Sequence, residues 1–304
     1  MGGLGNQLFQ IAAGLNVSFS ENVPLIIDDS YGNFRKNASS QADIFTYERS
    51  IFSTLRIPPD KKKYLGRILS LLIRMSLRSR EEIKPRVLRL ILSKLVSVLL
   101  ALKLRRKIAV WCSTDVGYEP IPYSSKSQYL IGYFQTYRYA ELNKVKSVMS
   151  SLTLPDKKIF EMEELAKQEC PLIVHIRLGD YLQESSFGVL SHEYYDRAIS
   201  LMTSKYNFEK IWVFSDDIEN AKSYIPDRFT TLCRWIDDKN DSACVTLEKM
   251  RLGSGYVIGN SSFSWWGAFL ARKISAPTIA PNPWFIGMKQ PNELIPSNWI
   301  IIDR

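Results

Sequence analysis

The feature that most constrains the fold is the alternation of apolar and helical segments after residue 155. Three apolar runs have the length of buried strands: 172–177, 211–214 and 256–258. Segments of helical character follow or separate them: 192–204, 217–224 and 243–252. Ser191 stands directly before the first helical segment, where its hydroxyl can cap the helix. Strands separated by helices predict a mainly parallel sheet covered on both faces.

The first predicted strand ends in an imidazole, a guanidinium and a carboxylate within six residues. These groups belong to His175, Arg177 and Asp180, in the sequence His-Ile-Arg-Leu-Gly-Asp-Tyr. His175 and Arg177 share a face of the strand because they are two residues apart. They lie at the carboxyl end, where open α/β sheets bind ligands. Taken alone, this motif fits a strand end with a surface Arg–Asp pair equally well.

A second motif, Gly-Asn-Ser-Ser-Phe-Ser-Trp-Trp-Gly-Ala, covers residues 259–268. It follows a predicted strand, and a helix is expected to begin near Ser262. The hydroxyls of Ser261 and Ser262, with the N–H groups of the first helical turn, can form an anion site. Alone, the motif fits an ordinary capped helix with two packed tryptophans. Combined with Arg177, whose guanidinium binds phosphate oxygens in a bidentate manner, it favours a diphosphate site.

The amino-terminal half gives weaker signals. Glycines at positions 2, 3 and 5 precede a predicted helix, an arrangement that allows close backbone approach of an anion. Strands are predicted at 23–28 and 129–134, and residues 153–156 read as a linker. We therefore expect two domains, at 1–155 and 156–304, the second of which binds the phosphates.

Residues 61–107 form a basic, leucine-rich segment that is predicted to be a helical insertion. They contain fifteen Lys and Arg and two acids, a local charge of +13 in a chain of net charge +9. Leucines recur at helical spacing over 64–79 and 86–104, with Pro85 between the two stretches.

Three interpretations of this basic segment compete. The basic residues alternate with leucines rather than aromatic residues, which disfavours nucleic acid. The longest uncharged run, Leu95–Leu102, is too short to span a bilayer. Two interpretations remain. The segment is either a basic amphipathic hairpin that lies on an anionic membrane surface or a helical insertion that packs on the domain and exposes a basic face to solvent. We favour the membrane surface because acids are nearly absent.

No metal or disulfide framework is expected. The four cysteines are scattered and include no C-x-x-C pair. Asp216 and Asp217 are adjacent, so their carboxylates point apart, and we expect helix capping or a ribose contact. The amino terminus lacks a basic region followed by an apolar stretch, as a secretory signal has. The expected location is cytoplasmic, peripheral at the inner membrane face.

Five segments together resemble the bacterial α-1,2-fucosyltransferases of glycosyltransferase family 11. They are GGLGNQLFQ, HIRLGDY, FSDD, NSSFSWWGA and IPSNWI, in the family's order over nearly the whole chain. The resemblance implies an α/β fold of two Rossmann-like domains, arranged as in the GT-B class. It also implies a GDP-β-L-fucose donor, a galactoside acceptor, and neither a metal nor a cofactor.

The resemblance assigns roles to particular residues. Arg177 matches an arginine that holds the donor β-phosphate. His175 matches a histidine that lies against the donor nucleoside. The turn that closes on the diphosphate matches Ser261, Ser262 and Phe263. The amino-terminal turn facing the donor across the interdomain cleft matches Gly3, Gly5 and Asn6. Asp180 is the candidate for accepting the proton of the acceptor hydroxyl, and Glu184 is the second candidate; Asp180 could instead pair with Arg177 to orient it.

Two departures from the family pattern affect the site. Leu178 stands where the family often has a second arginine, which implies one phosphate contact fewer. Thr246 stands where the family commonly has an aspartate that reads guanine N–H groups, and Asp241 or Glu248 is expected to substitute.

The expected activity is inverting α-1,2 transfer of L-fucose to a galactoside of a surface polysaccharide repeat, O-antigen-like and lipid-linked. Departure of GDP puts negative charge on the β-phosphate, which preorganised donors stabilise. One alternative is transfer of a related deoxysugar from a GDP donor. The other is a membrane-associated scaffold without enzymatic activity, which leaves the His-Arg-Asp cluster unexplained.

Overall fold

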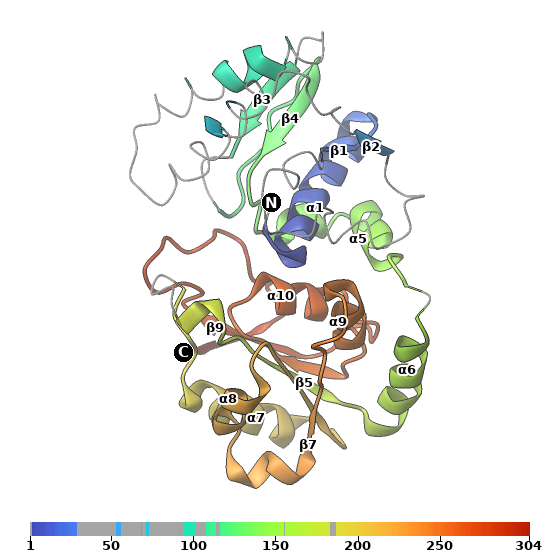
Figure 1. Ribbon diagram of the computed structural model, residues 1–304, viewed down its shortest axis with the longest axis vertical. Coiled ribbons are helices and arrows are strands. Elements are labelled where there is room, and N and C mark those ends of the chain that lie inside the picture. Colours follow the sequence, from blue (N-terminus) through green and yellow to red (C-terminus); the bar gives the residue numbers. More distant parts are fainter. Residues whose placement is uncertain are drawn as a thin grey trace.

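The computed structural model describes residues 2–28, 53–55, 68, 71–72, 91, 94–100, 102, 108–113, 116–154, 156–182 and 187–304. Figure 1 shows an upper part, built by residues before 155, and a lower part that begins with helix α6 (Lys157–Glu169). The chain ends in the lower part.

The lower part contains a six-stranded sheet in which every strand pairs in parallel with its neighbours. Its strands are β5 (Leu172–Ile176), β6 (Ile211–Ser215), β7 (Cys233–Trp235), β8 (Gly255–Val257), β9 (Thr278–Asn282) and β10 (Ile300–Asp303). The spatial order is β7-β6-β5-β8-β9-β10. This is the doubly wound Rossmann order, which reverses direction between β5 and β8. Ligands bind such sheets at the carboxyl ends of the strands on either side of this reversal.

The helices of the lower part begin on capping side chains. They are α6, α7 (His192–Lys205), α8 (Ile218–Ala221), α9 (Ala243–Met250) and α10 (Ser262–Phe269). In each helix the residue before the first turn accepts a backbone N–H: Asp156, Ser191, Asp217, Ser242 and Ser261. The predicted cap at Ser191 is confirmed, since its hydroxyl accepts the Tyr194 N–H at 3.2 Å. Such caps satisfy N–H groups that the helix itself leaves without partners.

The two faces of the sheet are packed by different helices. Leu172, Val174 and Ile176 of β5 join an apolar cluster that includes buried residues of α7. Ile173, which points the other way, joins a cluster that contains α9 and α10 residues. His175 and Arg177 share the direction of Ile173 because strand side chains alternate. The face that carries α9 and α10 is thus the face on which the predicted site residues lie.

The upper part is built around helix α1 (Leu4–Glu21), with α4 (Tyr137–Ala140) and α5 (Asn143–Ser150) beside it. Two parallel strand pairs accompany these helices: β1 (Ile26–Asp28) with β2 (Ser53–Leu55), and β3 (Ile108–Cys112) with β4 (Ser127–Ile131). The predicted α/β class with parallel sheets is confirmed. The Rossmann order is found in the lower part, whereas the described residues of the upper part form only these two pairs. The domain boundary at 155 stays a prediction.

The predicted basic insertion lies mostly outside the described residues. Those that are described are helical: 68, 71–72, 91, 94–100 and 102. Val96 and Leu100 are fully buried and pack with Ile131 of β4, so this helix is attached to the β3–β4 pair through one face. Within the described residues, no helix has the length and apolarity needed to cross a bilayer.

Helix α1 joins the two parts because its first turns pack on α10. The ring of Phe9 lies 4.6 Å from that of Trp265 and 4.9 Å from that of Trp266. A Cβ atom on Gly5 would lie only 2.6 Å from the backbone of Ser262 and Phe263. The absence of a side chain at Gly5 therefore allows the first turns of the two helices to touch.

The Gly5 contact gives a prediction about stability. Gly5→Ala should lower the free energy of unfolding by about 2 kcal/mol or more, since backbone atoms must move to admit the methyl group. Gly3→Ala is the matched control, because nothing lies within 4 Å of a Cβ atom at that position. Urea unfolding of both variants measures the difference. Equal urea midpoints for Gly5→Ala and Gly3→Ala would show that the close approach of α1 and α10 does not contribute to stability.

Candidate functional site

The site is built where β5 and β8 end, at the reversal of strand order. Two neighbouring tyrosines of α7 fix these strand ends from the other side of the sheet. The hydroxyl of Tyr194 donates to the carbonyl of Ile258 at 2.8 Å, and that of Tyr195 to the carbonyl of His175 at 3.2 Å. Both tyrosines are buried. The backbone around the reversal is thus held by buried hydrogen bonds, which favour a single geometry.

Arg177 is held by Asp216, the residue that follows the neighbouring strand β6. Its Nη1 lies 3.1 Å from Oδ2 of Asp216, and both side chains are partly exposed. The other oxygen, Oδ1, accepts the Leu178 N–H at 2.9 Å. A Cβ atom on Gly179 would lie 2.2 Å from Oδ2, so glycine at this position leaves room for the carboxylate. Asp216 therefore fixes both the guanidinium and the turn that follows β5.

The carboxylate pair was predicted to serve as helix cap or ribose contact. Asp217 caps α8, since its Oδ1 accepts the Asn220 N–H at 3.2 Å. Asp216 instead pairs with Arg177, the partner that sequence analysis considered for Asp180. Asp180 begins the short 3-10 helix Asp180–Leu182, and its side chain lies outside the described residues, as does Glu184. Their catalytic roles stay predictions.

Tyr181 and Asn260 connect the two strand ends, a connection that sequence analysis missed. The guanidinium carbon of Arg177 lies 5.6 Å from the ring centre of Tyr181. The Tyr181 hydroxyl donates to the Asn260 carbonyl at 3.1 Å. The buried amide of Asn260 in turn donates to the carbonyls of Phe187, Gly188 and Trp284. One aromatic side chain therefore separates Arg177 from the turn that opens α10.

Ser261 and Ser262 lie where predicted, at the amino end of α10. The Ser261 hydroxyl accepts the Phe263 N–H at 3.3 Å, and Ser262 is the first helical residue. Ser264 adds a buried hydroxyl that donates to the carbonyls of Gly259 and Ser261. The turn is thus closed by its own side chains, and the remaining N–H groups of the first turn give this helix end a partial positive charge.

His175 is buried directly beneath this turn. Its ring lies 6.4 Å from that of Phe263, and Nδ1 has no hydrogen-bond partner among the described residues. A Cβ atom on Gly259 would lie 3.5 Å from Nδ1. Burial, with a smaller contribution from the charge of Arg177, lowers the pKa of His175 to about 3. The imidazole is therefore neutral at physiological pH, and Arg177 supplies the positive charge on this face.

The amino-terminal residues of the predicted site border the same turn. Gly5 packs on Ser262 and Phe263, so the close approach it allows is to α10. Gly3 is the cap position of α1, and nothing lies within 4 Å of a Cβ atom there. Oδ1 of Asn6 accepts a hydrogen bond from Gln135 Nε2 at 2.8 Å. Contacts of these three residues with a donor stay predictions.

The two acids expected to replace the missing aspartate have other partners, so that expectation is wrong. Asp241 pairs with Lys158 at 2.6 Å and with Lys249 at 2.5 Å, and its side chain is almost fully buried. Glu248 is fully buried and pairs with Arg251 and Arg272. These carboxylates already hold ion pairs and are shielded from a ligand.

A third acid at this edge was not considered in the sequence analysis. Asp238, which follows β7, is half-buried, and burial raises its pKa. It accepts a hydrogen bond from the side chain of Thr246, the residue at the position of the family aspartate. Leu178, in place of the second arginine, is buried in the apolar cluster on the α7 side and faces away from the site.

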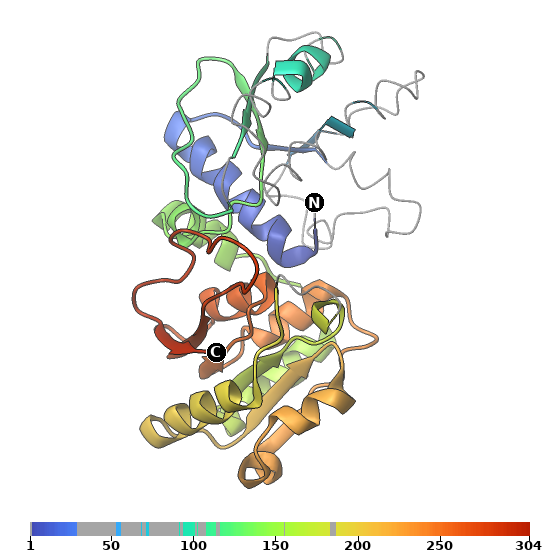
Figure 2. The ribbon, with the colours of Figure 1, turned by 90° about the vertical axis from the view of Figure 1, so that its left-hand side faces the viewer.

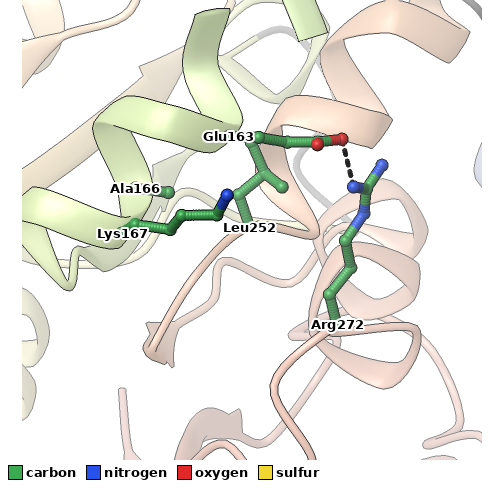
Figure 3. A pocket seen from close by; sticks show the side chains of 5 residues that line it. All are labelled: Glu163, Ala166, Lys167, Leu252 and Arg272. Carbon is green, nitrogen blue, oxygen red and sulfur yellow. Dashed lines mark hydrogen bonds and ion pairs between the residues drawn. The ribbon is translucent and has the colours of Figure 1, made fainter. Parts of the chain in front are cut away.

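A pocket of about 220 Å³ lies elsewhere in the lower part (Figure 3). It is lined by α6 and by the segments that follow α9 and α10, and Arg272 pairs there with Glu163. Leu252 and Arg272 lie at the other ends of α9 and α10 from the capped turns, so this pocket is separate from the Arg177 site. In the part of the chain that the structure describes, no three His, Cys, Asp or Glu side chains are grouped to hold a metal ion.

The environment of His175 predicts a pH-dependent contribution to stability. Its pKa of about 3 in the folded state lies below the ordinary histidine value of about 6.5. The unfolded chain therefore binds more protons in this window, and stability falls as the pH drops from 6.5 towards 3. Between about pH 7 and about pH 5 the wild type should lose roughly 2 kcal/mol more than His175→Gln. Urea unfolding at the two pH values measures both losses. If the wild type and His175→Gln lost the same free energy of unfolding, the lowered pKa of His175 would be contradicted.

Comparison with known proteins identifies the family of this chain. The family model described as glycosyl transferase family 11 matches residues 4–303. An α-1,2-colitosyltransferase of Escherichia coli is 26% identical over 322 aligned positions, which cover 100% of this chain and 97% of the relative. The O-antigen biosynthesis glycosyltransferase WbnK of Escherichia coli is 32% identical over 138 residues, 42% of this chain and 43% of the relative.

Among solved structures, the fucosyltransferase NodZ of Bradyrhizobium aligns with a TM-score of 0.46 and 11% identity, covering 87% of this chain and 88% of that chain. The family assignment does not depend on that alignment, because the family model covers nearly all of the sequence. The protein belongs to glycosyltransferase family 11 and is a sugar-transferring enzyme.

Proposed function

We propose that this enzyme transfers L-fucose from GDP-β-L-fucose to O2 of a galactoside, with inversion at the anomeric carbon. The observation that carries the proposal is the convergence of Arg177 and two helix amino ends at the reversal of strand order. The first turns of α1 and α10 touch at Gly5, and neither turn contains an acidic residue. Arg177 lies one tyrosine ring away from the opening of α10.

Two helix amino ends side by side repel each other, because each carries about half a positive charge. The contact at Gly5 brings them together without a protein carboxylate in either first turn. A diphosphate between them and Arg177 offsets this repulsion and accepts hydrogen bonds from the backbone N–H groups. These charges favour a nucleoside diphosphate, the leaving group of a nucleotide sugar.

The chemistry follows from where charge develops. Breaking the bond from sugar to GDP places negative charge on the β-phosphate and positive charge on the sugar ring. Arg177, Ser261, Ser262 and the first turn of α10 stabilise the departing diphosphate in a preorganised arrangement. We assign to Asp180 the acceptance of the proton from the acceptor hydroxyl, with Glu184 as the second candidate. Attack from the face opposite GDP converts the β-linked donor into an α-linked product.

The neutral, buried His175 suits a contact with the uncharged portion of the donor. We propose that Arg177 supplies the charge for the diphosphate and that transfer needs no divalent metal.

A related deoxysugar is the second candidate donor. The α-1,2-colitosyltransferase matches this chain over its full length, whereas nothing in the described site identifies the group that meets C3 of the sugar. Colitose differs from fucose in lacking the hydroxyl at C3. The similarity to an O-antigen biosynthesis glycosyltransferase supports a surface polysaccharide repeat as the acceptor. The scaffold alternative is dropped, because the chain belongs to an enzyme family.

The function is tested by incubating the protein with GDP-fucose or GDP-colitose and a panel of galactosides, with excess chelator present. We expect transfer from GDP-fucose and an α-1,2 linkage in the product by NMR. Transfer from GDP-colitose alone would favour the second candidate. No transfer from either donor, or activity that appears only after manganese is added, would contradict the mechanism.

The same assay examines Arg177 through matched variants. Arg177→Ala should lower kcat/KM by at least about a hundredfold, and Arg177→Lys should recover only part of it, because a lysine lacks the bidentate fork. Arg228→Ala is the control, since Arg228 is an exposed arginine paired with Asp196 away from the site.

The positioning of Arg177 yields a separate prediction for Asp216. Asp216→Asn keeps an acceptor for the Leu178 N–H but removes the ion pair, so kcat/KM should fall about tenfold or more as the guanidinium loses its fixed direction. Asp217→Asn makes the same charge change one residue away and keeps the cap of α8. Steady-state kinetics on both variants decide the matter. Equal activities would remove the positioning role from Asp216.

A further inference from the structure

The helix over residues 94–100 has two apolar faces, and the described residues cover one of them. Val96 and Leu100 are fully buried against Ile131 of β4, and the Ser97 hydroxyl donates to the Ile108 carbonyl of β3 at 2.6 Å. These contacts fix the orientation of the helix on the β3–β4 pair. Its outer face is therefore a defined surface.

Among the described residues, that outer face and the helical residues just before and after it form an aliphatic stripe. Ile91, Leu95, Val98 and Leu102 are 48%, 46%, 56% and 68% exposed. Leu95 and Val98 are three residues apart and therefore lie on the same side of this helix, away from Val96 and Leu100, and the spacings of Ile91 and Leu102 match that side. An apolar stripe that none of the described residues covers favours an apolar partner.

The sequence around the stripe indicates the sign of the partner's charge. The stripe lies within residues 61–107, whose net charge is +13, whereas the rest of the chain is negative overall. Lys94, next to Leu95, is exposed. A second copy of the chain would bring an equally basic segment against the first, and like charges disfavour that contact. An anionic surface with an apolar interior fits both features.

We propose that Ile91, Leu95, Val98 and Leu102 form a docking stripe for an anionic lipid bilayer, on which the helix lies parallel to the membrane plane. Aliphatic side chains enter the boundary between headgroups and acyl chains, and the exposed Lys94 contacts the lipid phosphates. Figures 1 and 2 both show the helix at the tip of the upper part, farthest from the sheet that carries Arg177. Docking through this tip leaves the lower part, with α10 and the six-stranded sheet, on the other side of the upper part from the bilayer.

Co-sedimentation of the full chain with vesicles tests the docking stripe without any use of transfer activity. Vesicles of phosphatidylcholine are compared with vesicles of equal parts phosphatidylcholine and phosphatidylglycerol. We expect binding to the anionic vesicles alone, and weaker binding at high salt, where the Debye length falls to about 3 Å at 1 M. A wild type that stays in the supernatant with both vesicles overturns the proposal.

Matched variants separate the stripe from general hydrophobicity. The triple variant Leu95→Ser, Val98→Ser, Leu102→Ser should bind anionic vesicles at least about tenfold more weakly. The control Phe160→Ser, Ile274→Ser, Ile301→Ser removes three exposed apolar side chains from the lower part and should bind as the wild type does. Circular dichroism reports whether the triple variant folds. If it does not fold, the single change Val98→Asp at an exposed position gives the same test.

The remaining outcomes also decide the proposal. Equal vesicle binding by the stripe variants and the control would overturn it. So would a wild type that is dimeric by analytical ultracentrifugation without lipid and becomes monomeric on changing the stripe, because the stripe would then face a second copy.

Discussion

The arrangement of the site depends on one carboxylate, that of Asp216. One oxygen pairs with Arg177, the other accepts the Leu178 N–H, and the group lies so close to Gly179 that no side chain fits there. An arginine at a strand end has several rotatable bonds, and holding it in one direction costs conformational entropy. The ion pair with Asp216 offsets this entropy cost in the free protein, before any ligand binds. Because β5 and β6 are neighbours in the sheet, this pairing links two turns that are far apart in sequence.

The second constraint is the joint between the two parts of the chain. On one side Gly5 lets α1 touch the opening of α10, and Phe9 packs against Trp265 and Trp266. On the other side Arg251, buried beside Glu248, donates to the carbonyls of Ser150 and Leu152 at the end of α5. Close packing sets the distance between the parts and directional hydrogen bonds set their angle. The meeting of two helix amino ends is therefore a property of the fold, which a ligand does not have to create.

Sequence analysis predicts the local features of this structure well and the long-range ones poorly. The strands at 172–176 and 211–215 and the caps at Ser191 and Ser261 follow from signals within a few residues. Strands β7, β9 and β10 were not predicted: β7 is only three residues long and contains Arg234, and β9 contains Pro281. The partner of Arg177 could not be identified because Asp216 reaches it through the pairing of two strands. The approach of Gly5 to α10 was not predicted either, since a sequence does not distinguish close approach to a ligand from close approach to a helix.

The distribution of acids explains why an anion site can form beside a joint so rich in charge. Glu248 is fully buried and pairs with Arg251 and Arg272, while Asp241 pairs with Lys158 and Lys249. A buried carboxylate without its partners is strongly destabilising, so these acids stay in their ion pairs. They can neither compete for Arg177 nor repel a diphosphate at the opening of α10. Asp216, which pairs with Arg177, follows β6, on the opposite side of β5 from β8 and α10, so it orients the guanidinium without placing a carboxylate at the opening of α10.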